Sequence, residues 1–539
     1  MRKNFVCAAG WMLFFQGLIS LLGVGAIAGS TANGDQPPNV LLIAVDDLKT
    51  IGTLYADEQG SFLKHIYPDQ KTRTEVVQRM TPNIQRLADR GVRFMDAYCA
   101  APACNPSRAA LMTGIRPVTS GLTTNAGGVF FRDYEYDGKK PLADAVTLPE
   151  LLKANGWYTG ATGKIFHSGS SFAKSDGNRS WTAWTNVRGD AGKKTRDRFS
   201  PKSLDWGREG DESATFESLN DVRKAKFIAQ VLRDGKAIDG ANRFELDQRP
   251  FFLACGIFRP HLPFYATQDL LNLFPPEEMT VRRELLTYFL DDAGDLPEQA
   301  YGWCGLSVDA NGHPKIGKDR FVDILNHGKR VDGKDGDLAG WKQMLQHYFA
   351  SCAIADRAIG KLLDGLDAGP YRENTMIILW SDHGYHLGEK LHETKFTLWD
   401  AGANVNLIIC DPRHRKQAGK RCDQPVSLID LFPTVAKMAG IESMPDQLIL
   451  GQDLEPLLAN PDRPRKEPVL TTYRTVKNHM LRTERFKLIR YDDDDASVEL
   501  YDMRADPEEY RNLAASPDHE STLAELIEMM DSELAASTP

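Results

Sequence analysis

The chain has 539 residues, of which 42% are hydrophobic and 26% are charged, a balance typical of globular proteins with a sizeable core. This composition excludes disordered, collagen-like and coiled-coil chains. The formal net charge of -9 argues against a general nucleic-acid binder, and eight cysteines are too few for a disulfide scaffold.

The first residues are typical of a secretory leader. A basic start precedes an apolar stretch from Phe5 to Gly29 and small exit residues, so we predict a signal peptide over 1–32, with an uncleaved anchor as the alternative. In both cases the body is exported, to the periplasm, the medium or, in a eukaryote, a lysosome-like compartment. No other apolar stretch is long enough to span a bilayer, and we expect no stable membrane partner. Export permits disulfides; Cys410 and Cys422 are candidates, but the sequence leaves their pairing open.

Strand and helix signals alternate along residues 38–440, which predicts a doubly wound α/β domain. Two strands end in polar residues, Asp46-Asp47 and Ser381-Asp382-His383, and chemistry in such sheets gathers beyond the carboxyl ends of strands. Thr81 is the expected cap of the first helix. The expected strands are 39–45, 158–162 and 375–380, and the expected helices are 81–90, 147–155 and 344–366.

Two further segments differ from this domain in their composition and in the elements they predict. Residues 168–249 read as a surface excursion with one helix near 216–233. Residues 441–539 are expected to form a small β-rich subdomain, with a hairpin over 479–501 and a closing helix over 522–534. The acidic run 492–495 resembles a calcium-binding loop in composition, but a solvated turn between strands is the favoured interpretation.

The strongest chemical signal is the segment from Cys104 to Gly114, with the sequence CNPSRAALMTG. A thiol stands at a helix start, and Arg108 follows one turn later. Both the helix N-terminus and the cation favour a thiolate or an anionic ligand, so the segment predicts an anion site with an unusual cysteine. The alternative is a helix-capping turn with a buried, inert cysteine.

This segment resembles the signature of the sulfatase family, Cys-x-Pro-Ser-Arg followed by Thr-Gly. The resemblance covers about residues 38–515, and within the family it is nearest to iduronate 2-sulfatases and their bacterial relatives. Arg259 stands where lysine is more usual. The other matching segments are Asn39–Leu48, Thr81–Ile84, Gly91–Phe94, Thr159–His167, Arg259–Phe264, Ser381–Glu389 with Lys395, and Glu499–Glu509.

The resemblance implies an alkaline-phosphatase/sulfatase-like α/β fold: a large mixed, mostly parallel sheet flanked by helices, with a small C-terminal antiparallel-sheet subdomain. It implies a sulfuric ester hydrolase that removes sulfate from sulfated sugars in the manner of an iduronate 2-sulfatase. Cys104 would be oxidised to formylglycine (3-oxoalanine) by a formylglycine-generating enzyme. The substrate partner would be a sulfated saccharide, with a 2-O-sulfated uronic acid as the expected unit.

The resemblance also implies the roles of individual residues. Arg108 would stabilise the formylglycine hydrate, and Lys164 and Lys395 would bind sulfate oxygens. His167 would be the base, and His261 would serve the leaving oxygen or the sulfate. We expect His386 to line the substrate pocket and His392 to have no specific role. One divalent cation, expected to be Ca²⁺, would be held by Asp46, Asp47, Cys104, Asp382 and His383.

Two other functions remain open from the sequence. A phosphoester or phosphonate monoester hydrolase of the same superfamily would use the same nucleophile and metal ligands. A secreted carbohydrate-binding protein without catalysis would not need them, and the intact set of Cys104, Arg108, Lys164, His167 and Asp382 argues against it.

Overall fold

The computed structural model describes residues 37–167, 176–185, 205–210, 214–240, 242–303, 306–309, 314–316, 320–332 and 338–538. The predicted leader and parts of the 168–249 segment lie outside these residues. Pro37–Pro539 forms one compact unit, and Met1–Gln36 is not part of it. Within the described ranges, no helix has the length and hydropathy that a membrane crossing requires.

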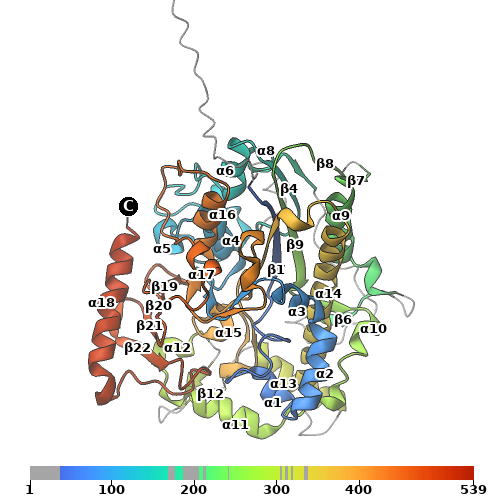
Figure 1. Ribbon diagram of the computed structural model, residues 1–539. Coiled ribbons are helices and arrows are strands. Elements are labelled where there is room, and N and C mark those ends of the chain that lie inside the picture. Colours follow the sequence, from blue (N-terminus) through green and yellow to red (C-terminus); the bar gives the residue numbers. More distant parts are fainter. Residues whose placement is uncertain are drawn as a thin grey trace, which may run out of the picture. The chain divides into compact units, whose positions relative to one another are not determined.

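A mixed sheet forms the centre of the described chain (Figure 1). Its strand order is β17-β2-β16-β13-β1-β9-β4-β5. The strands from β13 to β5 pair in parallel, whereas β16 is antiparallel to both β13 and β2. β1 is buried at every position, which explains its continuous apolar sequence. The strands are β1 (Asn39–Asp46), β2 (Val92–Phe94), β4 (Tyr158–Gly163), β5 (Ala183–Trp184), β9 (Phe251–Pro260), β13 (Thr375–Ser381), β16 (Leu407–Cys410) and β17 (Arg421–Cys422).

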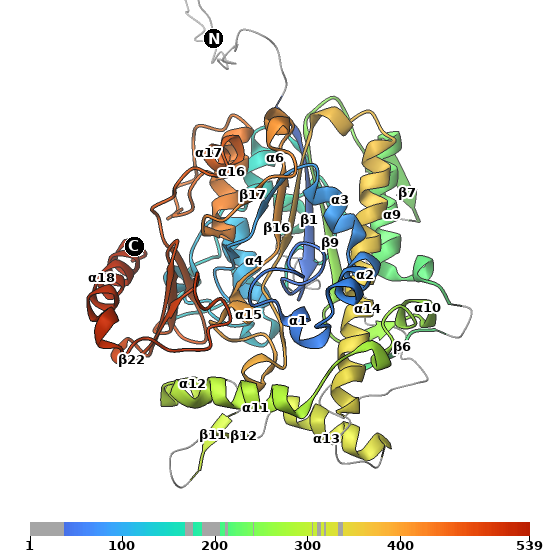
Figure 2. The same cartoon turned by 60° about the horizontal axis from the view of Figure 1, so that its bottom comes forward.

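Helices cover both faces of this sheet. In both views α9 and α14 lie together on one side of β1 and β9, and α4, α6 and α16 lie on the other (Figures 1 and 2). The predicted helices are confirmed, with α14 longer than expected. Their bounds are α3 (Pro82–Ala88), α4 (Cys104–Thr113), α6 (Leu148–Ala154), α9 (Asn220–Asp234), α14 (Ala339–Asp367), α16 (Leu431–Met438) and α18 (Glu520–Ala536).

The cap of α3 differs from the prediction. The Thr81 side chain does not cap the helix; its Oγ1 accepts a hydrogen bond from Thr53 N at 2.9 Å. Asp356 on α14 accepts the free backbone N–H groups of Asn83 at 2.9 Å and Ile84 at 2.8 Å. A side chain 273 residues later therefore satisfies the helix start.

The C-terminal antiparallel sheet is present, with strand order β19-β20-β21-β22. α18 packs against it through Leu526 and Met530. Asp492 and Asp493 form the turn between β21 and β22 with φ of 53° and 57°, as the solvated-turn interpretation expects. The strands are β19 (Val469–Thr472), β20 (His479–Arg482), β21 (Phe486–Tyr491) and β22 (Asp494–Asp502).

Cys410 and Cys422 are both free thiols. They lie on β16 and β17, and β2 separates these strands in the sheet. Cys410 Sγ instead donates a hydrogen bond to Leu87 O at 3.3 Å. A disulfide between them would require the sheet order to change.

Shorter elements complete the described chain. The remaining helices are α1 (Phe62–Ile66), α2 (Gln70–Met80), α5 (Pro117–Ser120), α8 (Gly177–Ser180), α10 (Gln268–Leu271), α11 (Arg283–Asp292), α12 (Glu298–Tyr301), α13 (Arg320–Asp332), α15 (Asp400–Ala403) and α17 (Glu455–Ala459). Two-stranded sheets pair β3 (Ala97–Tyr98) with β18 (Val426–Ser427), β6 (Trp206–Arg208) with β10 (Phe264–Ala266), β7 (Lys236–Asp239) with β8 (Asn242–Glu245), β11 (Leu306–Val308) with β12 (Pro314–Ile316), and β14 (His386–Leu387) with β15 (Glu393–Thr394).

Candidate active site

The sheet brings the two acid-bearing strand ends together. β1 and β13 are parallel neighbours, with Val45 opposite Ser381, so the residues that follow them meet at one edge. Asp47 N donates a hydrogen bond to Asp382 Oδ1 at 3.1 Å. Asp47 also has a φ of 60°, which turns the chain sharply after β1.

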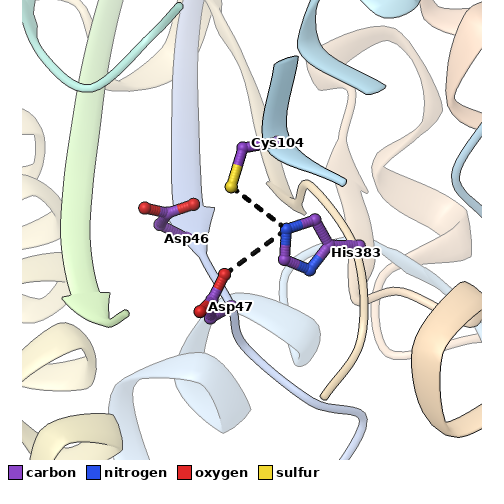
Figure 3. A group of neighbouring side chains, drawn as sticks. All are labelled: Asp46, Asp47, Cys104 and His383. Carbon is purple, nitrogen blue, oxygen red and sulfur yellow. Dashed lines mark hydrogen bonds and ion pairs between the residues drawn. The ribbon is translucent and has the colours of Figure 1, made fainter. Parts of the chain in front are cut away.

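Cys104 lies opposite this edge as the first residue of α4 (Figure 3). Its Sγ is 3.3 Å from His383 Nε2, 3.5 Å from Lys395 Nζ and 3.6 Å from Lys164 Nζ. Burial raises the pKa of the Cys104 thiol, but the charges of Lys164, Lys395 and His383 outweigh burial and hold that pKa well below its usual value. The position therefore favours an anionic group.

Arg108 connects α4 to both strand ends. Its Nε donates to Asp382 Oδ2 at 2.8 Å, and its Nη2 is 3.2 Å from Asp46 Oδ1. Its Nη1 donates to the carbonyl oxygens of Lys164 and Ile165. The guanidinium is fully buried, so these bonds satisfy it inside the protein and fix α4 relative to the sheet.

Each of the two lysines pairs with one of the β1 carboxylates. Lys164 Nζ contacts Asp46 Oδ2, and Lys395 Nζ donates to Asp47 Oδ1 at 2.6 Å. Burial and the Cys104 charge raise the pKa of Asp46, but Lys164, His261 and Arg108 outweigh them and the pKa lies below its usual value. Asp46 is therefore ionised at neutral pH.

The acids and His383 fit a divalent cation. Ligand atoms of Asp46, Asp47, Cys104 and His383 lie within 4.8 Å of one another, and Figure 3 shows His383 between Cys104 and Asp47. Asp382 Oδ2 is 3.6 Å from His383 Nε2. Burial raises the pKa of Asp382 to about 7, with Arg108 opposing and Asp46 adding to the rise. A cation would relieve this crowding of buried negative charge, and carboxylate oxygens suit a hard ion.

The predicted histidines have different surroundings. Burial raises the pKa of the Cys104 thiol more strongly than any single neighbour lowers it. The His167 side chain hydrogen-bonds to Cys104 and is one of the neighbours that lower this pKa. His167 Nδ1 is buried without a hydrogen-bond partner among the described atoms. His261 packs against Phe258 with ring centroids 4.7 Å apart, and its charge acts on Asp46. His167 thus lies next to the thiol, whereas His261 lies near Asp46.

His386 is engaged within its own loop. Its Nδ1 is 3.1 Å from Glu389 O, and its Nε2 is 2.6 Å from Thr397 Oγ1. Burial holds the pKa of His386 well below its usual value, so the ring is neutral. It lines a cavity of about 630 Å³ with Lys49 and Lys390, and this cavity does not include Cys104 among its lining residues.

Sequence reasoning missed the support for His261. Asp221 on α9 is fully buried, and its Oδ2 accepts hydrogen bonds from Phe258 N at 3.0 Å and Arg259 N at 2.8 Å. The Arg259 guanidinium bonds to the carbonyl oxygens of His261 and Pro263. Asp221 carries no motif signal, because its role depends on α9 packing beside the end of β9.

Comparison with known proteins agrees with this arrangement. The family model described as "Sulfatase" matches residues 38–441, and "N-sulphoglucosamine sulphohydrolase, C-terminal" matches residues 388–536. A "Sulfatase" of Formosa agariphila is 30% identical over 488 residues, which cover 88% of this chain and 83% of that protein. The "Iduronate 2-sulfatase" of Mus musculus is 27% identical over 468 residues, covering 79% and 73%.

A solved structure with a different stated activity shares the fold. The phosphonate monoester hydrolase of Agrobacterium radiobacter superposes with a TM-score of 0.63 at 18% identity, covering 93% of this chain and 96% of that one. The fold alone therefore does not separate sulfate esters from phosphonate esters.

Proposed function

Because the chain belongs to the sulfatase family and is a sulfuric ester hydrolase, we propose that it removes sulfate from sulfated sugars with a nucleophile derived from Cys104. The observation that carries the proposal is the position of Cys104 Sγ, within 3.6 Å of two lysines and hydrogen-bonded to His383 at the carboxyl edge of the sheet. A sulfate ester placed there would meet positive charge at its oxygens and a nucleophile at its sulfur.

The nucleophile is the hydrate of a formylglycine that a formylglycine-generating enzyme makes from Cys104. One hydroxyl of the hydrate attacks the sulfur, and the sugar oxygen leaves. The second hydroxyl then loses its proton, which restores the aldehyde and expels the sulfate. A serine has a single hydroxyl and could not carry out the second step. His167, which contacts the Cys104 side chain, accepts that proton, and His261 supplies a proton to the sugar oxygen that leaves.

The charged residues prepare the site for an anion. Lys164 and Lys395 neutralise sulfate oxygens, and Arg108 holds α4 and the strand ends in register. Asp46, Asp47, His383 and the group at Cys104, whose ligand atoms lie together, would hold one divalent cation with Asp382 as a further ligand, and we infer that the ion is Ca²⁺. When bound, such an ion would polarise a sulfate oxygen and lower the pKa of the attacking hydroxyl.

The substrate is inferred from relatives. The Mus musculus relative is an iduronate 2-sulfatase, and the motifs around His167, His261 and Lys395 resemble that group. We therefore propose that the substrate is a saccharide that contains a 2-O-sulfated uronic acid. We also propose that the protein is exported and meets this saccharide outside the cytoplasm. A panel of defined sulfated oligosaccharides, assayed for released sulfate, identifies the unit.

The second candidate is a phosphonate or phosphoester monoester hydrolase, favoured by the shared fold of the Agrobacterium radiobacter enzyme. Rates on matched aryl sulfate and aryl phosphate esters separate the two. A larger kcat/KM for the phosphate ester would contradict sulfatase chemistry.

Mass spectrometry of the peptide that contains Cys104 tests the nucleophile. Protein from its native host should carry an aldehyde in place of the thiol, and Cys104→Ala should lower kcat on an aryl sulfate by about 10⁴-fold or more. Cys99→Ala is the matched control, because Cys99 is another buried free thiol. An unmodified, active Cys104 would refute the proposal.

A further inference from the structure

The loop around Lys395 holds several non-glycine residues in the left-handed region of φ. Lys390 has a φ of 54°, Leu391 of 53°, Thr394 of 98° and Phe396 of 85°. Arg474, distant in sequence, has a φ of 69°. Such conformations cost free energy and persist where the surrounding structure imposes them, often at ligand sites. The loop around Lys395 and the turn at Arg474 are therefore two segments whose backbone the surrounding structure constrains.

A row of aromatic rings begins at Lys395. The Lys395 Nζ, which contacts Cys104 Sγ at 3.5 Å, lies 5.6 Å from the centroid of the Phe396 ring. Phe396 stacks on Tyr473, with centroids 5.9 Å apart and an interplanar angle of 14°. Tyr473 meets the edge of Trp303 at 5.5 Å. The rings thus lead from the reacting group to a side chain of the segment after α12.

A second set of contacts places the same rings near Cys104. Thr471 Oγ1 donates to Cys99 O at 2.7 Å, and Thr472 N donates to Ala100 O at 3.0 Å. The end of β19 is therefore fixed to the segment that leads into α4. Tyr473 follows directly, so the turn that carries Arg474 begins next to the segment that leads into α4.

Arg474 lies at the end of this row. Its guanidinium carbon lies 5.8 Å from the centroid of the Trp303 ring, and its side chain is exposed. Other arginines of the C-terminal sheet pair with acids, such as Arg482 with Asp96 and Arg490 with Asp531. Within the described residues Arg474 has no carboxylate within salt-bridge distance.

We propose that Arg474 and the rings of Trp303, Tyr473 and Phe396 form a subsite for a second acidic group of the sugar chain. The proposal rests on the proposed sulfatase function. Arg474 presents a planar fork of N–H donors that matches a carboxylate or a sulfate, and the Trp303 ring lies next to its guanidinium. Phe396 and Trp303 are partly exposed and offer apolar surface to a sugar, and the buried ring of Tyr473 lies against both of them. The scissile sulfate binds at Cys104, and the second anion binds at Arg474.

The test compares Arg474→Gln with wild type on four substrates: an aryl sulfate, a disaccharide whose only acid is the scissile sulfate, and disaccharides with an added carboxylate or an added sulfate. The KM for the acidic disaccharides should rise about 10- to 100-fold, with little change in kcat. The KM for the other two should stay within about 2-fold. Whichever acidic disaccharide responds identifies the source of the anion.

Two controls separate a specific contact from general charge. Lys477→Gln removes an exposed cation from the same turn and should leave every KM unchanged. Arg474→Lys keeps the charge but loses the planar fork, so the KM should lie between those of wild type and Arg474→Gln. In wild type, the acidic disaccharides should inhibit aryl sulfate hydrolysis more strongly than the singly sulfated one.

Several results would overturn the subsite. These are an unchanged KM for the acidic disaccharides in Arg474→Gln, an equal rise for all four substrates, or equal inhibition of wild type by acidic and singly sulfated disaccharides. In each of these cases wild type still hydrolyses the aryl sulfate, so the proposed function stands. Absence of that hydrolysis refutes the proposed function instead.

Discussion

The buried charges around Cys104 occur as matched pairs. Asp46 pairs with Lys164, Asp47 with Lys395, and Asp382 with Arg108. Removing one partner of such a pair leaves an uncompensated buried charge, which is more costly than losing the attraction alone. The two lysines therefore have two contacts each: each offsets the charge of a buried acid and holds it in place, and each lies next to Cys104 Sγ.

Lys395→Met tests the role of a lysine at the reacting group. It should lower kcat on an aryl sulfate by about 10²- to 10³-fold, because a donor to the developing charge is lost. Lys390→Met is the matched control, since Lys390 is another buried, ion-paired lysine of the same loop. It should reduce the free energy of unfolding and leave kcat of the folded enzyme within about 3-fold. An equal loss of kcat in both variants would assign Lys395 a structural role only.

At the scale of single elements, α3 depends on α14 for its start. The carboxylate of Asp356 accepts three hydrogen bonds, from Asn83 N, Asn83 Nδ2 and Ile84 N. A local residue would ordinarily do this, but Thr81 bonds to Thr53 instead. Consequently the start of α3 and the middle of α14 are stabilised together.

Asp356→Ala should lower the free energy of unfolding by about 1–3 kcal/mol, because it leaves buried N–H groups without acceptors. Asp364→Ala is the control on the same helix. Asp364 is an exposed acid paired with Arg86, and its loss should change stability by about 0.5 kcal/mol or less. Urea denaturation measures both. A smaller effect for Asp356→Ala than for Asp364→Ala would exclude the capping role.

At the scale of the whole molecule, one lysine joins three distant segments. Lys390 Nζ contacts Asp292 Oδ1 at 2.5 Å, at the end of α11, and Glu509 O in the C-terminal region. Burial raises the pKa of Asp292 to about 7, although Lys390 opposes the rise. The folded protein thus holds a proton on Asp292 more tightly than the unfolded chain does.

The raised pKa of Asp292 makes the free energy of unfolding depend on pH. Between about pH 4 and pH 7 the folded state binds more protons at Asp292, so the free energy of unfolding falls as pH rises, by up to about 1.4 kcal/mol per pH unit. Asp292→Asn should remove this component, whereas Asp291→Asn, at the neighbouring exposed acid, should not. Denaturation at pH 4.5 and pH 7.5 measures the difference. Parallel pH profiles for wild type and Asp292→Asn would contradict it.

The local sequence predicted those features that depend on one segment of the chain alone. The apolar run before Asp46 predicts a buried strand, and the run before Asp382 predicts another. The rule for doubly wound sheets places both acids at the carboxyl edge, but that the two strands are neighbours is known only from the structure. The roles of Asp356 and Asp221, and the proposed role of Arg474, were not predictable, because each depends on a partner brought near by packing. The free Cys410 shows the same limit, since strand order keeps it from Cys422.

The complete burial of Cys104 also constrains the timing of biosynthesis. Its exposed fraction is 0%, and it is enclosed by side chains that are translated later, from Lys164 to Lys395. If Cys104 is converted to an aldehyde as proposed, the converting enzyme must grip the chain around this thiol, which a fully buried position does not allow. Oxidation would then precede the docking of the segment after β13, and a chain that folds before conversion would keep the thiol.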